Sequence, residues 1–154
     1  MTAYALPYSL HVLAAMVWVG GMFFAWMILR PAAATVLEGP PRLQLWLEVF
    51  PRFFSWVWIA VLVLAVSGVG MLHMHYSGFD HAPRHVQVMM GGAIAMFALF
   101  MRVQSLLLPE LRKAVEAGDW AAGAGVMGRI RRMVGINLLL GIAVIVVAAS
   151  RLSF

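Results

Sequence analysis

Four long apolar segments dominate this chain of 154 residues. They cover residues 7–30, 51–76, 83–108 and 130–152. A helix needs roughly 20 apolar residues to cross a hydrocarbon layer of about 30 Å, and each segment reaches that length. The segments are punctuated by proline or glycine, at Pro7, Pro31, Pro51, Gly78, Pro83 and Pro109. The pattern predicts an all-α fold, a four-helix transmembrane bundle that forms a single integral membrane domain over residues 1–154.

Composition supports a membrane protein and excludes several other classes. The chain is 64% hydrophobic and 11% charged, whereas soluble domains are roughly 45–50% apolar and about 25% charged. The lipid bilayer is therefore the expected partner. The net charge of +5 comes from residues clustered between the spans, so we expect no nucleic-acid partner. With no cysteine, the chain has no disulfides and no thiolate metal ligands.

The connections between the spans differ in character. In the first, residues 32–50, apolar residues alternate with Arg42, Gln44 and Glu48. That pattern predicts a short interfacial helix lying along the head groups. The third, residues 110–129, predicts a polar helical turn that breaks at Gly118. No internal repeat is visible beyond the four apolar segments.

The distribution of basic residues predicts an orientation. Nine of the 11 Lys and Arg residues lie on the side of the first and third connections: Arg30, Arg42, Arg52, Arg102, Arg112, Lys113, Arg129, Arg131 and Arg132. Only Arg84 and Arg151 lie on the other side. The positive-inside rule then places the first and third connections in the cytoplasm. We expect a bacterial inner (cytoplasmic) membrane protein whose termini and second connection face the periplasm.

All five histidines gather at the opposite side from this charge. His11 lies one turn inside the first span, His73 and His75 close the second, and His81 and His85 flank the start of the third. Antiparallel helices bring these positions to one membrane face. Polar groups at such depths usually face the bundle interior or a cavity, so the gathering predicts a metal or haem site.

The spacing of the histidines along the chain indicates which of them share a helix face. His73 and His75 are two residues apart and point about 200° apart on a helix, so we expect His73 to face inward. His81 belongs to the loop. His85 and Met89 are four residues apart and share a helix face. The alternatives for His11 are a hydrogen bond to the backbone, a proton relay or a contact with a quinone.

Two cofactors suit these ligands. Copper(I) favours imidazole and thioether donors, and among the 12 methionines four lie near the histidines: Met71, Met74, Met89 and Met90. Methionine also fills apolar cores. The alternative is haem b, which takes axial imidazoles from facing helices and fits a dry bundle interior.

A few other residues stand out within the spans. Asn137 predicts an interhelical hydrogen bond. The glycines of the spans, including Gly20, Gly21 and Gly92, predict close helix contacts. Arg30 can snorkel to the interface or pair with a propionate or phosphate that enters the bundle.

The first span contains His11, a short apolar spacer, Trp18 and the pair Gly20-Gly21 in that order. This order resembles the opening of the copper resistance protein D family. The likeness continues loosely through Arg52-Phe-Phe-Ser, Ser67-Gly68, Arg131-Arg132, Asn137 and Gly141. The opening is also similar to HemJ-type protoporphyrinogen oxidases, with Arg30 as the basic residue that ends the first span.

The two resemblances imply different functions. The copper resistance proteins imply the handling of copper between periplasm and cytoplasm. The HemJ-type proteins imply haem b and the last oxidation before haem, and His11 is the ligand to carry over in either case. The chain departs from the HemJ pattern, since Gln87 stands where a lysine is expected and Ile136-Asn137 where an asparagine–glutamate pair is expected.

We therefore expect copper binding by His11, His73, His85 and Met89, in copper uptake, delivery or tolerance, with a periplasmic copper carrier as partner. The alternative is a haem b protein with His11 and either His73 or His85 as axial ligands, serving electron transfer or porphyrinogen oxidation. If the protein is an enzyme, it is then a haem-dependent membrane oxidoreductase with a quinone as acceptor. A third reading is a non-catalytic accessory subunit of a membrane complex. An oligomer is compatible with all three.

Overall fold

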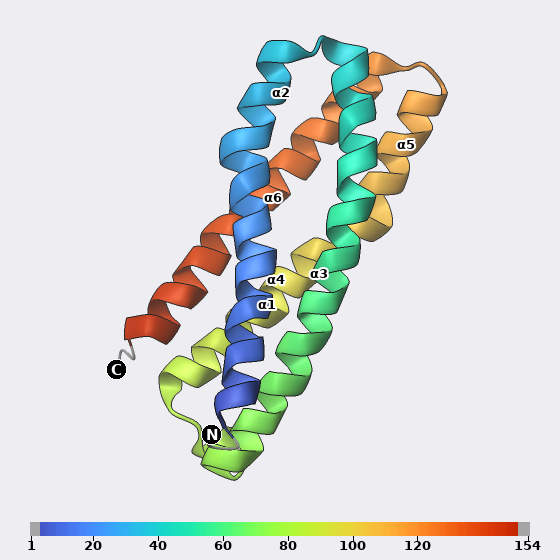
Figure 1. The fold of residues 1–154 in the computed structure, drawn as a ribbon. Coiled ribbons are helices and arrows are strands. Elements are labelled where there is room, and N and C mark those ends of the chain that lie inside the picture. The colour runs from blue at the N-terminus through green and yellow to red at the C-terminus, as the bar shows by residue number, and fades with distance from the viewer. Residues whose placement is uncertain (1–3, 151–154) are drawn as a thin grey trace.

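The computed structural model describes residues 4–150, and these residues form four long helical units joined by short turns (Figure 1). The units are Ala5–Val36, Gly39–Tyr76, Arg84–Glu116 and Trp120–Ser150. Each is long and apolar enough to cross a membrane. The predicted all-α, four-span architecture is confirmed.

Two of the four units contain a wider turn within the helix. The elements in order are α1 (Ala5–Phe24), the π-helical η1 (Ala25–Leu29), α2 (Arg30–Val36), α3 (Gly39–Tyr76), the 3₁₀ turn η2 (Phe79–His81), α4 (Arg84–Arg102), the π-helical η3 (Val103–Leu107), α5 (Leu108–Glu116) and α6 (Trp120–Ser150). The turns between units use positive φ at Ser77, Gly78 and Gly118. The predicted break at Gly118 is therefore present.

The helices extend further toward the basic side than the sequence suggests. Residues 39–50, expected as a separate interfacial helix, are helical but form the first turns of α3, and Pro51 lies inside that helix. The proline removes only one backbone bond, and the Arg52 guanidinium donates to the neighbouring carbonyl of Glu48 at 2.7 Å. At 38 residues, α3 is about 57 Å long.

Two other predicted boundaries also lie further toward the basic side in the structure. The first unit continues past Pro31 to Val36, and the fourth begins at Trp120 rather than near residue 130. The predicted end of the fourth span, at residues 151–152, lies outside the described residues.

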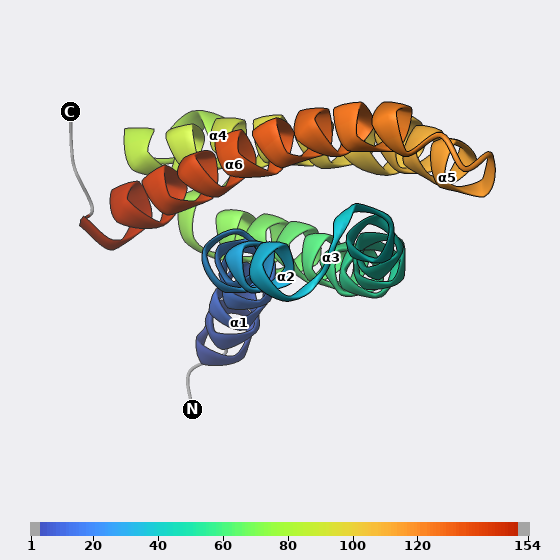
Figure 2. The ribbon, with the colours of Figure 1, turned by 90° about the horizontal axis from the view of Figure 1, so that it is seen from above.

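The four units pack as two hairpins. α1 lies along α3 and α4 lies along α6, and the view along the bundle shows these pairs as two layers (Figure 2). Aromatic residues join the layers: Phe100 of α4 meets the rings of Trp18 and Phe54 edge to face, at centroid distances of 6.3 and 5.2 Å. Such contacts bury apolar area and also fix the relative orientation of the rings.

Glycines allow the close approach within each hairpin. A Cβ on Gly21 would overlap the ring of Phe53, and one on Gly92 would overlap Val144. The preceding glycines, Gly20 and Gly91, face open space. The predicted role of these glycines in close helix packing is thus confirmed for the second member of each pair.

The two hairpins share a pattern that the sequence did not reveal. In each, a five-residue π segment is followed by one residue and then by proline, at Pro31 and at Pro109. Buried residues recur at equal distances before the two prolines: Trp18 and Met22 in the first hairpin, Met96 and Phe100 in the second. The chain therefore contains two similar helical hairpins in tandem.

Candidate functional site

His11 lies half-buried in α1 against α3. Its Nδ1 is 2.9 Å from the hydroxyl oxygen of Ser67. The imidazole also rests on Gly68, where a Cβ would lie 3.3 Å from His11 Cε1. The missing side chain at Gly68 thus makes room for the ring, and Ser67 holds it in one orientation.

The hydrogen bonds around Ser67 define the His11 tautomer. Ser67 is buried, and its hydroxyl donates to the carbonyl of Val63 one turn earlier in α3. Because that single proton is used, the Ser67 oxygen accepts the bond from His11, and Nδ1 carries the hydrogen. The lone pair of His11 then sits on Nε2. Histidines that bind metals show this arrangement, with the other ring nitrogen donating to the protein.

His73 has the same tautomer in a different setting. Its Nδ1 is 2.9 Å from the carbonyl of Val69, and since a carbonyl only accepts, Nδ1 carries the hydrogen and Nε2 is the lone-pair nitrogen. His73 is exposed, so the expectation that it faces the interior was wrong. It lies six residues after Ser67, about 240° around the helix, and therefore on another face of α3. Met71, four residues after Ser67, shares the face that meets α1.

His75 and His81 lie at the edge of the bundle. The ring of His75 is 4.7 Å from that of Tyr4, which precedes α1. His81 is exposed in η2, as the sequence predicts for a loop residue.

His85 and Met89 belong to the other layer. Both are half-buried and lie one turn apart near the start of α4, as their spacing predicts. α4 packs mainly on α6, whereas α1 packs mainly on α3. No hydrogen bond or ring contact described for residues 4–150 joins His85 to His11 or His73. In that same part of the chain, no three His, Cys, Asp or Glu side chains lie close enough to hold a metal ion.

Asn137 links the second hairpin at mid-bundle. Its amide nitrogen donates to the carbonyl of Met96 at 3.2 Å, which confirms the predicted interhelical bond. Its Oδ1 is buried without a partner among the described residues. This amide lines a small cavity between the layers. The other side chains that line the cavity are hydrophobic and include Trp18, Val57 and Phe100.

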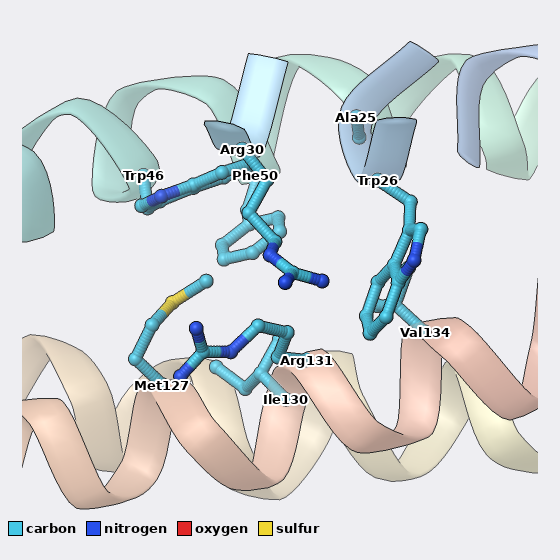
Figure 3. Close-up of a pocket in the computed structure, with 9 residues that line it drawn as sticks. All are labelled: Ala25, Trp26, Arg30, Trp46, Phe50, Met127, Ile130, Arg131 and Val134. Carbon is cyan, nitrogen blue, oxygen red and sulfur yellow. The ribbon is translucent and has the colours of Figure 1, made fainter. Parts of the chain in front are cut away.

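A second pocket lies at the opposite end from the histidines. We call this end, which carries Arg30, Arg42, Arg52, Arg102, Arg112, Lys113, Arg129, Arg131 and Arg132, the basic end. The pocket is lined by Ala25, Trp26, Arg30, Trp46, Phe50, Met127, Ile130, Arg131 and Val134. Figure 3 shows Arg30 and Arg131 approaching the same space from opposite helices. The sequence singled out Arg30, but the partnership with Arg131 depends on helix rotation that spacing alone does not reveal.

Comparison with known proteins adds one match. A family model for copper resistance protein D matches residues 47–151, more than half of the chain. The matched part runs from within α3 through α6 and leaves out α1 with His11. Neither the curated proteins nor the solved structures contain a match to this chain.

Proposed function

Since the chain belongs to the copper resistance protein D family, we propose that it is an integral membrane protein that binds copper at its histidine end. The histidine end comprises the start of α1, the end of α3, η2 and the start of α4. Copper is the cargo in this proposal, taken up, delivered or sequestered for tolerance. The supporting observation is the fixed orientation of His11 by Ser67.

The donor chemistry at His11 suits copper(I). Imidazole and thioether are the ligands that this ion favours. His11 offers Nε2, and the face of α3 that holds Ser67 continues one turn further to Met71. We propose Met71 as the soft ligand nearest to His11. It takes the place next to His11 that the sequence led us to expect for His73.

His73, His85 and Met89 enter the proposal as an outer group of ligands. His73 is exposed, and because its bond to Val69 uses Nδ1, its Nε2 is left for a ligand bond. It is suited to receive copper from a periplasmic carrier before the ion reaches the half-buried His11. His85 and Met89 present one imidazole and one thioether from α4.

Haem suits this arrangement less well. A bis-imidazole haem needs two rings on opposite sides of the iron, each with an Fe–N bond of about 2 Å. His11 contacts Ser67 and Gly68 of the adjacent helix through the Nδ1 side of its ring, so an iron would have to bind on the Nε2 side. No contact described within residues 4–150 places a second imidazole opposite His11, since His73 lies on another face of α3 and His85 belongs to the other layer.

The test is a copper(I) titration of the purified protein in mild detergent. We expect His11→Ala to weaken binding at least tenfold and Ser67→Ala to weaken it by about 10- to 100-fold, the usual effect of losing a group that orients a metal-binding histidine. His81→Ala is the matched control, since His81 is exposed in a turn, and should bind like the unchanged protein. Helical circular dichroism of each variant checks folding.

Two outcomes would overturn the proposal. Equal copper affinity in His11→Ala and His81→Ala would remove His11 from the site and favour the accessory-subunit reading. A haem absorption band in the purified protein that disappears in His11→Ala would assign His11 to haem instead.

A further inference from the structure

We propose that Arg30 and Arg131 form a binding site for the phosphate group of an anionic phospholipid at the basic end of the bundle. This site is separate from the histidine end and independent of the copper proposal.

Among the described residues, none with a negative charge lines the pocket that the two arginines share. Arg30 begins α2 and Arg131 lies in α6, and both line the same space (Figure 3). The ion pairs described in residues 4–150 use other arginines, Arg52 with Glu48 and Arg129 with Glu110. Two guanidinium groups that face one space repel each other, and an anion between them removes this repulsion.

Arg30 is held in position by an aromatic stack. Its guanidinium carbon lies 4.4 Å from the centroid of the Trp26 ring. The indole in turn lies against Gly135 of α6, where a Cβ would come within 2.9 Å of the ring. A stacked guanidinium keeps its planar edge available for the oxygens of a phosphate, and less side-chain freedom is lost when the bond forms. The pocket is therefore preorganised for an anion.

The remaining lining identifies a lipid as the ligand. Apart from the two arginines, the pocket is bordered by hydrophobic side chains: Ala25, Trp26, Trp46, Phe50, Met127, Ile130 and Val134. A free phosphate ion is hydrated on all sides and gains nothing from such walls. A phospholipid carries its phosphate directly above apolar chains. The site also lies at the end of the apolar spans, where arginine and tryptophan meet the head groups.

The experiment is native mass spectrometry of the protein released from bilayers of phosphatidylcholine with phosphatidylglycerol. The unchanged protein should retain phosphatidylglycerol in preference to phosphatidylcholine. Each of Arg30→Gln and Arg131→Gln should reduce this retention about fivefold, which corresponds to the usual contribution of one basic residue near an anionic surface. Arg132→Gln is the matched control, because Arg132 is the next residue of α6 and does not line the pocket.

A second pair of variants tests preorganisation without changing charge. Gly135→Ala pushes Trp26 out of its place and should lower retention of phosphatidylglycerol at least twofold. Gly128→Ala, on the same helix with nothing near its Cβ, should leave retention unchanged. Circular dichroism confirms that each variant remains helical.

Either of two results would overturn the proposal. Equal losses in Arg131→Gln and Arg132→Gln would mean that general surface charge, not this pocket, retains the lipid. Displacement of phosphatidylglycerol by inorganic phosphate at equal concentration would show that the pocket takes a free ion.

Discussion

Individual side chains set the separation of the helices within each hairpin. At Gly21 the ring of Phe53 occupies the space of the missing side chain, whereas Gly20 beside it faces open space. Gly92 and Gly91 differ in the same way. Of the two neighbouring glycines in each pair, only the second is needed for the close contact between the helices.

Gly21→Ala should lower the free energy of unfolding by about 1–3 kcal/mol, because the added methyl forces the ring of Phe53 to move in a packed interface. Gly20→Ala should leave it unchanged or raise it by up to about 1 kcal/mol, since alanine favours the helix. Unfolding in mixed micelles measures both. Equal effects of the two variants would contradict the packing described for Gly21.

The sequence predicted some of these residue-level features and missed others. The depth of His11 and the interhelical bond of Asn137 followed from polar side chains within apolar spans. The Ser67 bond to His11 and the meeting of Arg30 with Arg131 did not. Those pairs depend on how adjacent helices rotate about their axes, and hydrophobic spacing constrains that rotation only loosely.

Prolines shape the odd-numbered spans without ending them. Before Pro31, the N–H of Arg30 bonds to the carbonyl of Ala25 five residues back, and before Pro109, that of Leu108 bonds to Val103. A hydrogen bond between residues five apart encloses one more residue than the bond between residues four apart in an α-helical turn. The wider turn relieves the clash of the proline ring with the preceding carbonyls. In both spans the helix continues past the proline.

Deleting Met27 should convert the first π segment to an ordinary α-helical turn and lower the free energy of unfolding by up to about 3 kcal/mol, because the Pro31 ring then meets the preceding carbonyls. Deleting Met16, another exposed methionine, should cost more than about 3 kcal/mol, because it rotates the start of α1 by about 100° and moves His11 away from Ser67. Unfolding of both variants in mixed micelles, with circular dichroism, checks this. Similar losses in both would show that the π segment tolerates no shortening.

The proline effect also explains where the predicted boundaries failed. Pro31, Pro51 and Pro109 each resemble a helix end because proline lacks an N–H. Within a bundle, neighbouring helices and wider turns satisfy the freed backbone groups, so membrane helices tolerate proline inside them. A single sequence does not distinguish these two outcomes.

At the scale of the whole molecule, the helices are longer than a bilayer requires. The four units have 31 to 38 residues, whereas roughly 20 suffice to span the hydrocarbon. The surplus residues of α3 and α6, at their starts, and of α5 all lie at the basic end. The bundle therefore has an arginine-rich extension at one end and a short histidine-bearing turn at the other.

The chain has no cysteine, so single cysteines can report which end faces outward. His81→Cys should react with a membrane-impermeant maleimide in intact spheroplasts, because the positive-inside rule keeps the basic end in the cytoplasm. Glu116→Cys at the basic end should react only after lysis. Labelling of Glu116→Cys in intact spheroplasts would reverse the predicted orientation.

Because the two hairpins are similar, the side chain at a buried position in one hairpin indicates which side chains the matching position in the other hairpin can tolerate. When α3 and α6 are aligned by their buried residues, Leu43, Trp46 and Phe50 match Gly123, Val126 and Ile130. In this alignment Val57 and Asn137 occupy matching buried places, 80 residues apart. One framework has thus accepted a valine and an amide at equivalent depth. Redesign of the interior can therefore start by replacing a buried residue with the residue at the matching position of the other hairpin. Such exchanges would change the polarity at the bundle centre.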